Sequence, residues 1–161
     1  MLQLNAILAS LTDGDQTALR PHLRATHLEQ KTVLYEAGID TVYFPVTAVL
    51  SLVVTLATGE MTEAAMVGRD GGFGLASALD GKVAMCRTIF QLGGDALVCE
   101  PAAFKSAAMQ SEKLISIIMR HEQTLFAQAQ QSTACMAHHE VEARLCRWLL
   151  RARDLSGSDR L

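Results

Sequence analysis

From Ser111 to Asp154 the sequence holds no glycine and no proline, although the 161 residues include 11 glycines and 3 prolines. Glycine and proline are the residues that most disfavour a helix interior. The stretch therefore predicts helix, and a single helix of about 40 residues would be about 60 Å long. One small domain does not cover a helix of that length, so part of its surface needs another partner.

Selected residues along this stretch recur in steps of four and three, apolar at first and polar later. That spacing is a heptad pattern, in which one face of a helix packs against another helix. The cheapest partner is a second copy of the chain. The alternative is a helix that breaks near residues 137–140 and folds back in two pieces over the rest of the chain. The predicted dimer interface consists of Leu114, Ile118, His121, Leu125, Gln128, Ser132, Cys135 and His139.

The stretch from His27 to Pro101 has a different composition, rich in Val, Thr, Leu, Tyr and Phe, with turn residues at short intervals. This pattern is typical of short strands joined by tight turns. Glycine favours hairpins at Ala57–Glu60 and Leu92–Asp95 because tight turns need a positive φ. Helices are expected in residues 2–10 and 15–24 and from Pro101 to Met109. The fold class is therefore mainly β, a barrel, sandwich or jelly roll with flanking helices.

These patterns divide the chain into three parts. Residues 1–110 are expected to form the β-domain with its N-terminal helices, 111–154 the long dimerisation helix, and 155–161 a linker. Trp148 and Leu149 need a surface to bury against, which indicates that a further domain follows.

Net charge, composition and the absence of known motifs argue against several classes of function. The net charge of −3 gives no basic field for nucleic acid, and no stretch has the length of a membrane span or the basic start of a signal peptide. We therefore expect a cytoplasmic protein without membrane contact. The four cysteines are not clustered as metal ligands and are expected to be buried thiols. No catalytic motif appears, and the absence of histidine between residues 28 and 120 disfavours a metal enzyme of the cupin type, so no enzyme is expected.

The glycine-rich stretch "VGRDGGFGLAS" is the strongest candidate for a binding site. Successive glycines allow backbone amides to point into one concavity that holds an anion, and a short helix after them adds partial positive charge. Arg87, at the start of the next strand, is able to bind a phosphate through two donors, and Thr88 adds a hydroxyl. Glycine clusters more often serve only as turns. The candidate residues are Gly71, Gly72, Phe73, Gly74, Leu75, Arg87 and Thr88.

Several motifs taken in order resemble the sensor half of the Crp/Fnr superfamily of bacterial transcription regulators. These are "VLYEAG", "VYFPVTAVLS", the "TGE" turn, "VGRDGGFG", an Arg-Thr strand start, "GGDALV" and the ending "EARLCRWLLRARD". The resemblance covers residues 4–155. It implies a cyclic-nucleotide-binding-type double-stranded β-roll, a phosphate cassette at Gly71–Arg87, and a homodimer through the long helix. It also implies allosteric control of a helix-turn-helix domain that reads DNA and is absent from this chain, with RNA polymerase as a possible partner.

The sequence departs from the cyclic-nucleotide pattern at one position that matters. Binders in this superfamily carry a glutamate that accepts the ribose hydroxyl, whereas Gly74 and Leu75 stand there. A site that lacks this ligand should reject the molecule that needs it, so cyclic AMP is not the expected effector. Another nucleotide, another small molecule and no ligand at all remain open, the last as a ligand-free dimerisation scaffold. The polar residues of the heptad face either contact the effector or only set the helix register.

Overall fold

The computed structural model describes residues 2–34, 40–81 and 87–160. Most of the "VLYEAG" motif, Cys86 and the last residues before Arg87 in the predicted cassette lie outside the described residues. The predicted N-terminal helices are present but short. Thr12 caps the second of them through a capping box with Asp15. These elements are η1 (Leu2–Leu4), α1 (Ala6–Ala9), α2 (Asp13–Leu19) and the 3-10 turn η2 (Arg20–His22).

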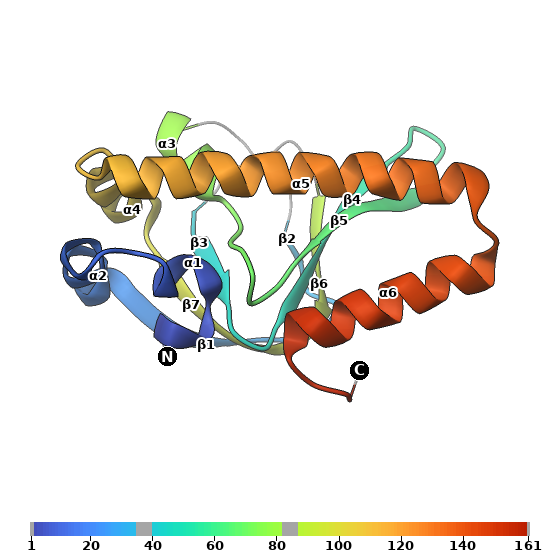
Figure 1. Ribbon diagram of the computed structural model, residues 1–161, viewed down its shortest axis with the longest axis horizontal. Helices are drawn as coiled ribbons and strands as arrows, with labels where there is room; N and C mark the ends of the chain where they lie inside the picture. Colours follow the sequence, from blue (N-terminus) through green and yellow to red (C-terminus); the bar gives the residue numbers. More distant parts are fainter. Residues whose placement is uncertain (1, 35–39, 82–86, 161) are drawn as a thin grey trace.

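Two antiparallel sheets form the β-domain, which confirms the predicted jelly roll (Figure 1). The first sheet has the order β1-β7-β3, made of Leu23–Leu28, Gly94–Cys99 and Val42–Pro45. The second sheet has the order β2-β6-β4-β5, made of Val33–Leu34, Arg87–Leu92, Val49–Thr55 and Met61–Val67.

The two predicted hairpins had different outcomes. The turn around Gly59 joins β4 to β5 as adjacent antiparallel strands, as expected. The prediction of a hairpin at Leu92–Asp95 is wrong, because β6 pairs with β2 and β4 whereas β7 pairs with β1 and β3. The chain crosses from one sheet to the other there. Gly94 permits the crossing, since a Cβ on it would lie 2.6 Å from the Thr47 hydroxyl oxygen.

Three groups of buried side chains hold the layers together. One lies between the first sheet and the helices, and includes Phe44, Phe104 and Leu114. A second lies within the roll around Phe73 and Phe90. The third is formed by the C-terminal helix on the second sheet. The short α3 (Leu75–Asp80) and α4 (Pro101–Ala108) join the first group, and α4 begins at the proline predicted to open it.

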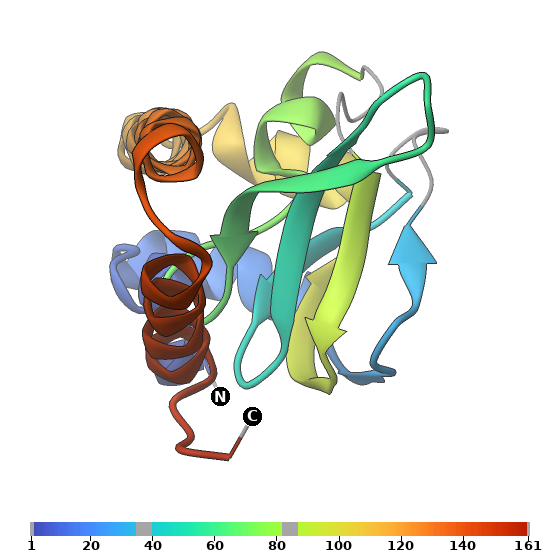
Figure 2. The same cartoon turned by 90° about the vertical axis from the view of Figure 1, so that its right-hand side faces the viewer.

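The long C-terminal helix is in two pieces, so the prediction of one helix over 111–154 is wrong. α5 (Glu112–His138) ends where His139 takes an extended conformation, and α6 (Val141–Ser156) begins after Glu140. α6 then runs back toward the N-terminal end of the domain, and both helices lie on one side of the sheets (Figures 1 and 2). Within the described residues no helix is long and apolar enough to cross a membrane.

The heptad face of α5 packs against the β-domain of its own chain. Leu114, Ile118, Ser132 and Cys135 are each less than a tenth exposed. Side chains buried to this extent have no surface left for a second copy, so the predicted dimer interface is wrong for these four. His121, Leu125 and Gln128 also contact the β-domain, and His139 is exposed at the break. For the last four residues the interface stays a prediction.

The cysteines divide into two environments. Cys99 and Cys135 are buried free thiols, as expected, and burial raises the pKa of Cys99 to about 11. Cys146 is exposed on α6, so the expectation of a buried thiol is wrong there.

Candidate functional site

The candidate site begins with the glycine corner, residues 68–74, which connects β5 to α3. Gly74 has a φ of +85°, the left-handed region that glycine adopts without strain. The two glycines before Phe73 are needed for close packing. A Cβ on Gly71 would lie 2.5 Å from the His121 ring, and one on Gly72 would lie 3.0 Å from the Tyr43 carbonyl oxygen. Glycine therefore allows α5 and β3 to approach the corner.

The amides of the corner are largely used within the chain. The Gly71 N–H donates to the Gly68 carbonyl (3.0 Å), and the Phe73 N–H donates to the Tyr43 carbonyl (2.8 Å). The Gly72 N–H lies 3.5 Å from Nε2 of His121. His121 Nε2 donates to the Gly72 carbonyl oxygen (2.8 Å) and therefore does not accept from the Gly72 N–H. Two of the three amides of the expected nest at 71–73 are thus already bonded within the chain.

Asn5 holds this corner and was missed by sequence reasoning. Its fully buried side-chain amide donates to the carbonyls of Gly71 (2.8 Å) and Pro45 (2.9 Å), and its oxygen caps α1. A capping asparagine is readable from sequence, but its contact with a residue 66 positions away is not.

Phe73 and Leu75 serve the core. Phe73 is 9% exposed, and its ring lies 6.3 Å from that of Tyr43, which in turn lies 5.8 Å from that of Phe90. Leu75 is 1% exposed and packs with the helical layer. No carboxylate replaces the missing ribose ligand at either position.

Arg87 and Thr88 open β6 at the end of the domain where α3 also lies (Figure 2). Arg87 is partly buried, and its Nη1 is 3.6 Å from the Met61 sulfur. Thr88 is fully buried in the ladder between Leu34 and Leu52, and its hydroxyl makes no hydrogen bond with the described residues. A buried hydroxyl without a partner is uncommon in folded proteins, because leaving it unpaired costs free energy.

The middle of α5 touches both the corner and β5. His121 Nε2 lies 2.8 Å from the Gly72 carbonyl oxygen, and the Gln128 side chain accepts from the Met66 N–H (3.3 Å). These two polar members of the heptad face therefore contact the β-domain directly. His121 links α5 to the glycine corner, and Gln128 links α5 to β5.

A partly buried carboxylate links the second sheet to α6 and was also missed. Glu63 on β5 accepts hydrogen bonds from the Ser51 hydroxyl and from Nε1 of Trp148 (3.3 Å). Burial raises the pKa of Glu63, while the bonds from Ser51 and Trp148 act in the opposite direction. The sequence indicated that Trp148 needs a surface, but not that this surface belongs to its own chain.

The C-terminal end of α6 reaches the same glycine corner. The Arg69 N–H donates to the Leu155 carbonyl (3.2 Å), and Arg151 forms an ion pair with Asp70 (2.6 Å). The corner thus contacts α1, α5 and α6 together.

At the level of sequence, no protein-family model and no curated protein matches the chain. Solved structures do match. A protein assigned to the Crp/Fnr family of transcriptional regulators from Eubacterium rectale has a TM-score of 0.75 at 11% identity, over 96% of this chain and 74% of that one. The c-di-GMP-responsive global regulator CLP of Xanthomonas campestris has a TM-score of 0.66 at 11% identity, over 86% of this chain and 70% of that one.

A third structure, assigned as a cAMP-binding regulatory protein from Silicibacter pomeroyi, has a TM-score of 0.62 at 16% identity over 81% of this chain. This chain spans 62% of the length of that protein. At these identities the comparisons show the fold. The chain has the fold of the cyclic-nucleotide-binding-type sensor domains found in Crp/Fnr regulators, a jelly roll followed by long helices.

Proposed function

We propose that this chain is the effector-sensing and dimerisation part of a bacterial transcription regulator of the Crp/Fnr type. The effector is an anionic small molecule, with a nucleotide other than cyclic AMP as the leading candidate. It binds within the roll near Arg87 and Thr88, and its occupancy controls an attached helix-turn-helix domain that reads DNA.

The observation that carries this proposal is the unpartnered hydroxyl of Thr88 beside a partly buried arginine. In the free protein this hydroxyl pays the cost of desolvation without a hydrogen bond. A ligand oxygen within the roll would give the Thr88 hydroxyl a hydrogen-bond partner, and Arg87 at the start of the same strand would add positive charge nearby. Arginine is suited to this role because its planar guanidinium binds phosphate oxygens in pairs.

The contacts of the glycine corner provide a way for ligand binding to change the positions of the helices. The glycine corner lies directly before α3, and it contacts α5 through His121 and α6 through Leu155. A ligand that binds one arrangement of the corner better than another shifts the population of helix positions. The shift is limited by the difference in affinity between the two arrangements.

A thermal-shift panel of mononucleotides, cyclic nucleotides and cyclic dinucleotides tests ligand binding. A true effector raises the melting temperature by mass action on the folded state. Arg87→Ala should abolish that rise, whereas Arg24→Ala, an exposed strand arginine on the other sheet, should leave it unchanged.

Thr88→Val sharpens the same test because its two effects have opposite signs. Valine has nearly the same shape and removes the unpaired hydroxyl, so the free protein should gain about 1 kcal/mol of stability. The ligand-induced rise should become smaller. If valine stabilises the protein and the panel gives no rise for any variant, the effector proposal fails.

A different face of α5 serves as the dimer interface in this proposal. Ile115, Met119, Phe126, Ala129 and Met136 each lie one position after a member of the predicted set, in steps of four, seven, three and seven. The polar residues Glu122 and Thr133 stand at the intervening positions of this stripe. Met119, Phe126 and Met136 are 62%, 67% and 45% exposed, large values for apolar side chains that follow one face. A second α5 packed along this stripe would cover them.

Phe126→Glu tests the interface by sedimentation or light scattering. The wild-type chain should be a dimer at micromolar concentration, and the variant a monomer with unchanged far-UV circular dichroism. Thr17→Glu, on exposed α2, is the control and should stay a dimer. A wild-type monomer at that concentration contradicts the proposed interface.

The alternative function is a ligand-free dimerisation scaffold, and the bonded amides of the glycine corner favour it. The Gly71 and Phe73 amides already have partners inside the chain, and Phe73 is part of the core. In that case the panel gives no thermal shift while Phe126→Glu still yields a monomer. The two experiments therefore separate sensing from assembly.

A further inference from the structure

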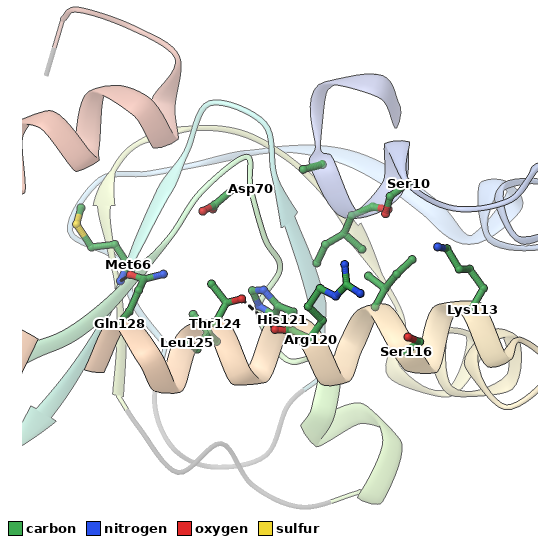
Figure 3. Close-up of a pocket in the computed structure, with 13 residues that line it drawn as sticks. Ser10, Met66, Asp70, Lys113, Ser116, Arg120, His121, Thr124, Leu125 and Gln128 are labelled. Atoms are coloured by element: carbon green, nitrogen blue, oxygen red, sulfur yellow. Dashed lines mark hydrogen bonds between the residues drawn. The ribbon is translucent and has the colours of Figure 1, made fainter. Parts of the chain in front are cut away.

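A cavity of about 260 Å³ lies outside the candidate cassette, among α1, Asp70 of the glycine corner and the middle of α5 (Figure 3). None of the seven predicted cassette residues lines it. Its α5 side chains, such as Lys113, Arg120 and Thr124, lie nearly opposite Phe126 around the helix, given the helical repeat of 3.6 residues. No residue of the proposed dimer stripe lines this pocket, although Ser116 and Arg120 also line a neighbouring hollow with Ile115 and Met119 of that stripe.

The inner part of the pocket is apolar. It is lined by Ile7 and Ala6 from α1, by Met66 from β5, and by Ile117 and Leu125 from α5. Ile7 and Met66 are 4% and 3% exposed, so these walls are fixed by core packing.

The rim carries more positive than negative charge. Arg120 and Lys113 extend from α5 on the side that faces α1 (Figure 3), and neither forms an ion pair with the described residues. The one carboxylate on the rim, Asp70, is bound to Arg151 at 2.6 Å and accepts from the Gly68 N–H at 3.3 Å. The two cations therefore face the pocket without a neutralising acid.

Two uncharged side chains add hydrogen-bond donors to the pocket. The Ser116 hydroxyl lies one helical turn from Arg120 and makes no hydrogen bond with the described residues. The Gln128 oxygen accepts from Met66, which leaves its amide hydrogens to donate. Besides Asp70, the acceptors on the wall include the neutral hydroxyl oxygens of Ser10 and Thr124. Charged donors therefore outnumber charged acceptors, as a site for an anion requires.

The size of the pocket limits the ligand. A cavity of about 150 Å³ holds a benzene molecule, so this one holds a single ring with a short chain or a short acyl chain. We propose that the pocket binds a small organic acid, with the carboxylate on Arg120 and Ser116 and the apolar part on Ile7, Ile117 and Leu125. Lys113, two turns from Arg120, contributes charge at longer range.

Calorimetric titration with 4-phenylbutanoate, without nucleotide, tests the proposal. The acid should bind at least about ten-fold more tightly than 4-phenylbutan-1-ol, because hydrogen bonds to a charged group exceed those to a neutral one. The corresponding amine, 4-phenylbutylamine, should bind more weakly than the alcohol. Equal affinity for the acid and the alcohol overturns the proposal.

Substitutions of the two cations on the rim should weaken binding of the acid to different degrees. Arg120→Gln should weaken binding of the acid about ten-fold, and Lys113→Gln about two- to three-fold, since its charge is more distant and more screened. Lys105→Gln, an exposed lysine on α4, is the matched control and should leave the affinity unchanged. Equal losses from Lys105→Gln and Arg120→Gln would mean general charge attraction and overturn the site.

A variant that fills the cavity tests whether the acid binds inside it. Thr124 is exposed on the pocket wall, so Thr124→Phe should occupy the cavity, abolish binding of the acid and preserve the circular dichroism spectrum. Unchanged affinity in a folded Thr124→Phe variant places the acid elsewhere. Failure of the nucleotide panel does not affect this titration, so the two proposals fail separately.

Discussion

α5 and α6 lie on the same side of the same β-domain, yet different forces hold them there. α5 contributes Leu114 and Ile118 to the main hydrophobic core, where they are 1% and 2% exposed. α6 buries Ala152 and Leu155 on a small patch of the second sheet, where Trp148 also packs, and it makes polar contacts through Trp148 and Arg151. Burial of aliphatic side chains is worth several times an exposed ion pair.

This difference indicates that α5 belongs to the folded domain, whereas α6 is a docked element. α6 leaves Val141, Leu145, Leu149 and Leu150 exposed at 40% or more. A helix held by a few contacts opens locally at lower free energy than one built into the core. Three predictions test this difference between the helices, and a fourth concerns an ion pair outside both of them. Trp148, as the single tryptophan, reports on α6.

The largest effect is expected in the contact between α5 and the core. Leu114→Ala removes a fully buried side chain from the main cluster, and should lower the free energy of unfolding by about 3 kcal/mol. Denaturant unfolding followed by circular dichroism measures it. Met119→Ala, on the exposed stripe, should change the stability of the monomer by less than about 0.5 kcal/mol. Similar losses in both variants would contradict the assignment of faces.

The next effect concerns the docking of α6. A Cβ on Gly68 would lie 2.5 Å from the Leu155 Cβ and 2.8 Å from its carbonyl oxygen. Gly68→Ala should therefore push α6 from the sheet, at a cost of about 1–3 kcal/mol. The emission of Trp148 should shift to longer wavelength as the indole becomes exposed. Gly14→Ala, whose Cβ meets nothing closer than 3.8 Å, should leave the emission unchanged.

A smaller, pH-dependent effect is expected at Glu63. Its folded-state pKa is raised, chiefly by burial, so the folded protein holds this proton to higher pH than the unfolded chain does. The contribution of Glu63 to stability is thus present at low pH and is lost as the pH rises through the raised pKa. Melting temperatures between pH 4 and 8 measure it, and Glu63→Gln should remove this component. An identical pH profile for both proteins counts against a titrating Glu63.

The smallest effect is expected outside both helices, at the exposed pair between His27 on β1 and Asp95 on β7 (2.9 Å). The hydrogen bond to Asp95 raises the pKa of His27. Its stabilising contribution is present at low pH and disappears as the pH rises through that pKa. An NMR titration should show a lower His27 pKa in Asp95→Asn, with a stability change near the limit of measurement. No change in the titration would show that the pair does not form in solution.

Much of the architecture was readable from local patterns. The Ala57–Glu60 turn and the helix start at Pro101 depend on residues close in sequence, and each is confirmed. The crossing at Leu92–Asp95 was not readable, because a glycine pair allows a tight turn without deciding which sheet the next strand joins.

The candidate site, too, was predicted only in part from local sequence patterns. The sequence singled out the glycine corner and Arg87–Thr88 by type and order, and these residues lie at the corner before α3 and at the start of β6. It did not reveal the contacts of Asn5, Glu63 and His121, since each partner lies at least 12 residues away. Whether the site binds a nucleotide stays a prediction.

The helical spacing and the absence of glycine and proline predicted a helix with an apolar face from Ser111 onward, because these are local properties, and α5 confirms it over Glu112–His138. Which surface covers that face, and whether the helix continues past His138, depend on packing between residues far apart in sequence. A break near residues 137–140 was the alternative, and His139 and Glu140 carry no strong local signal that would select it. The chain bends there because Trp148, Ala152 and Leu155 bury against the second sheet, which a continuous helix would not allow.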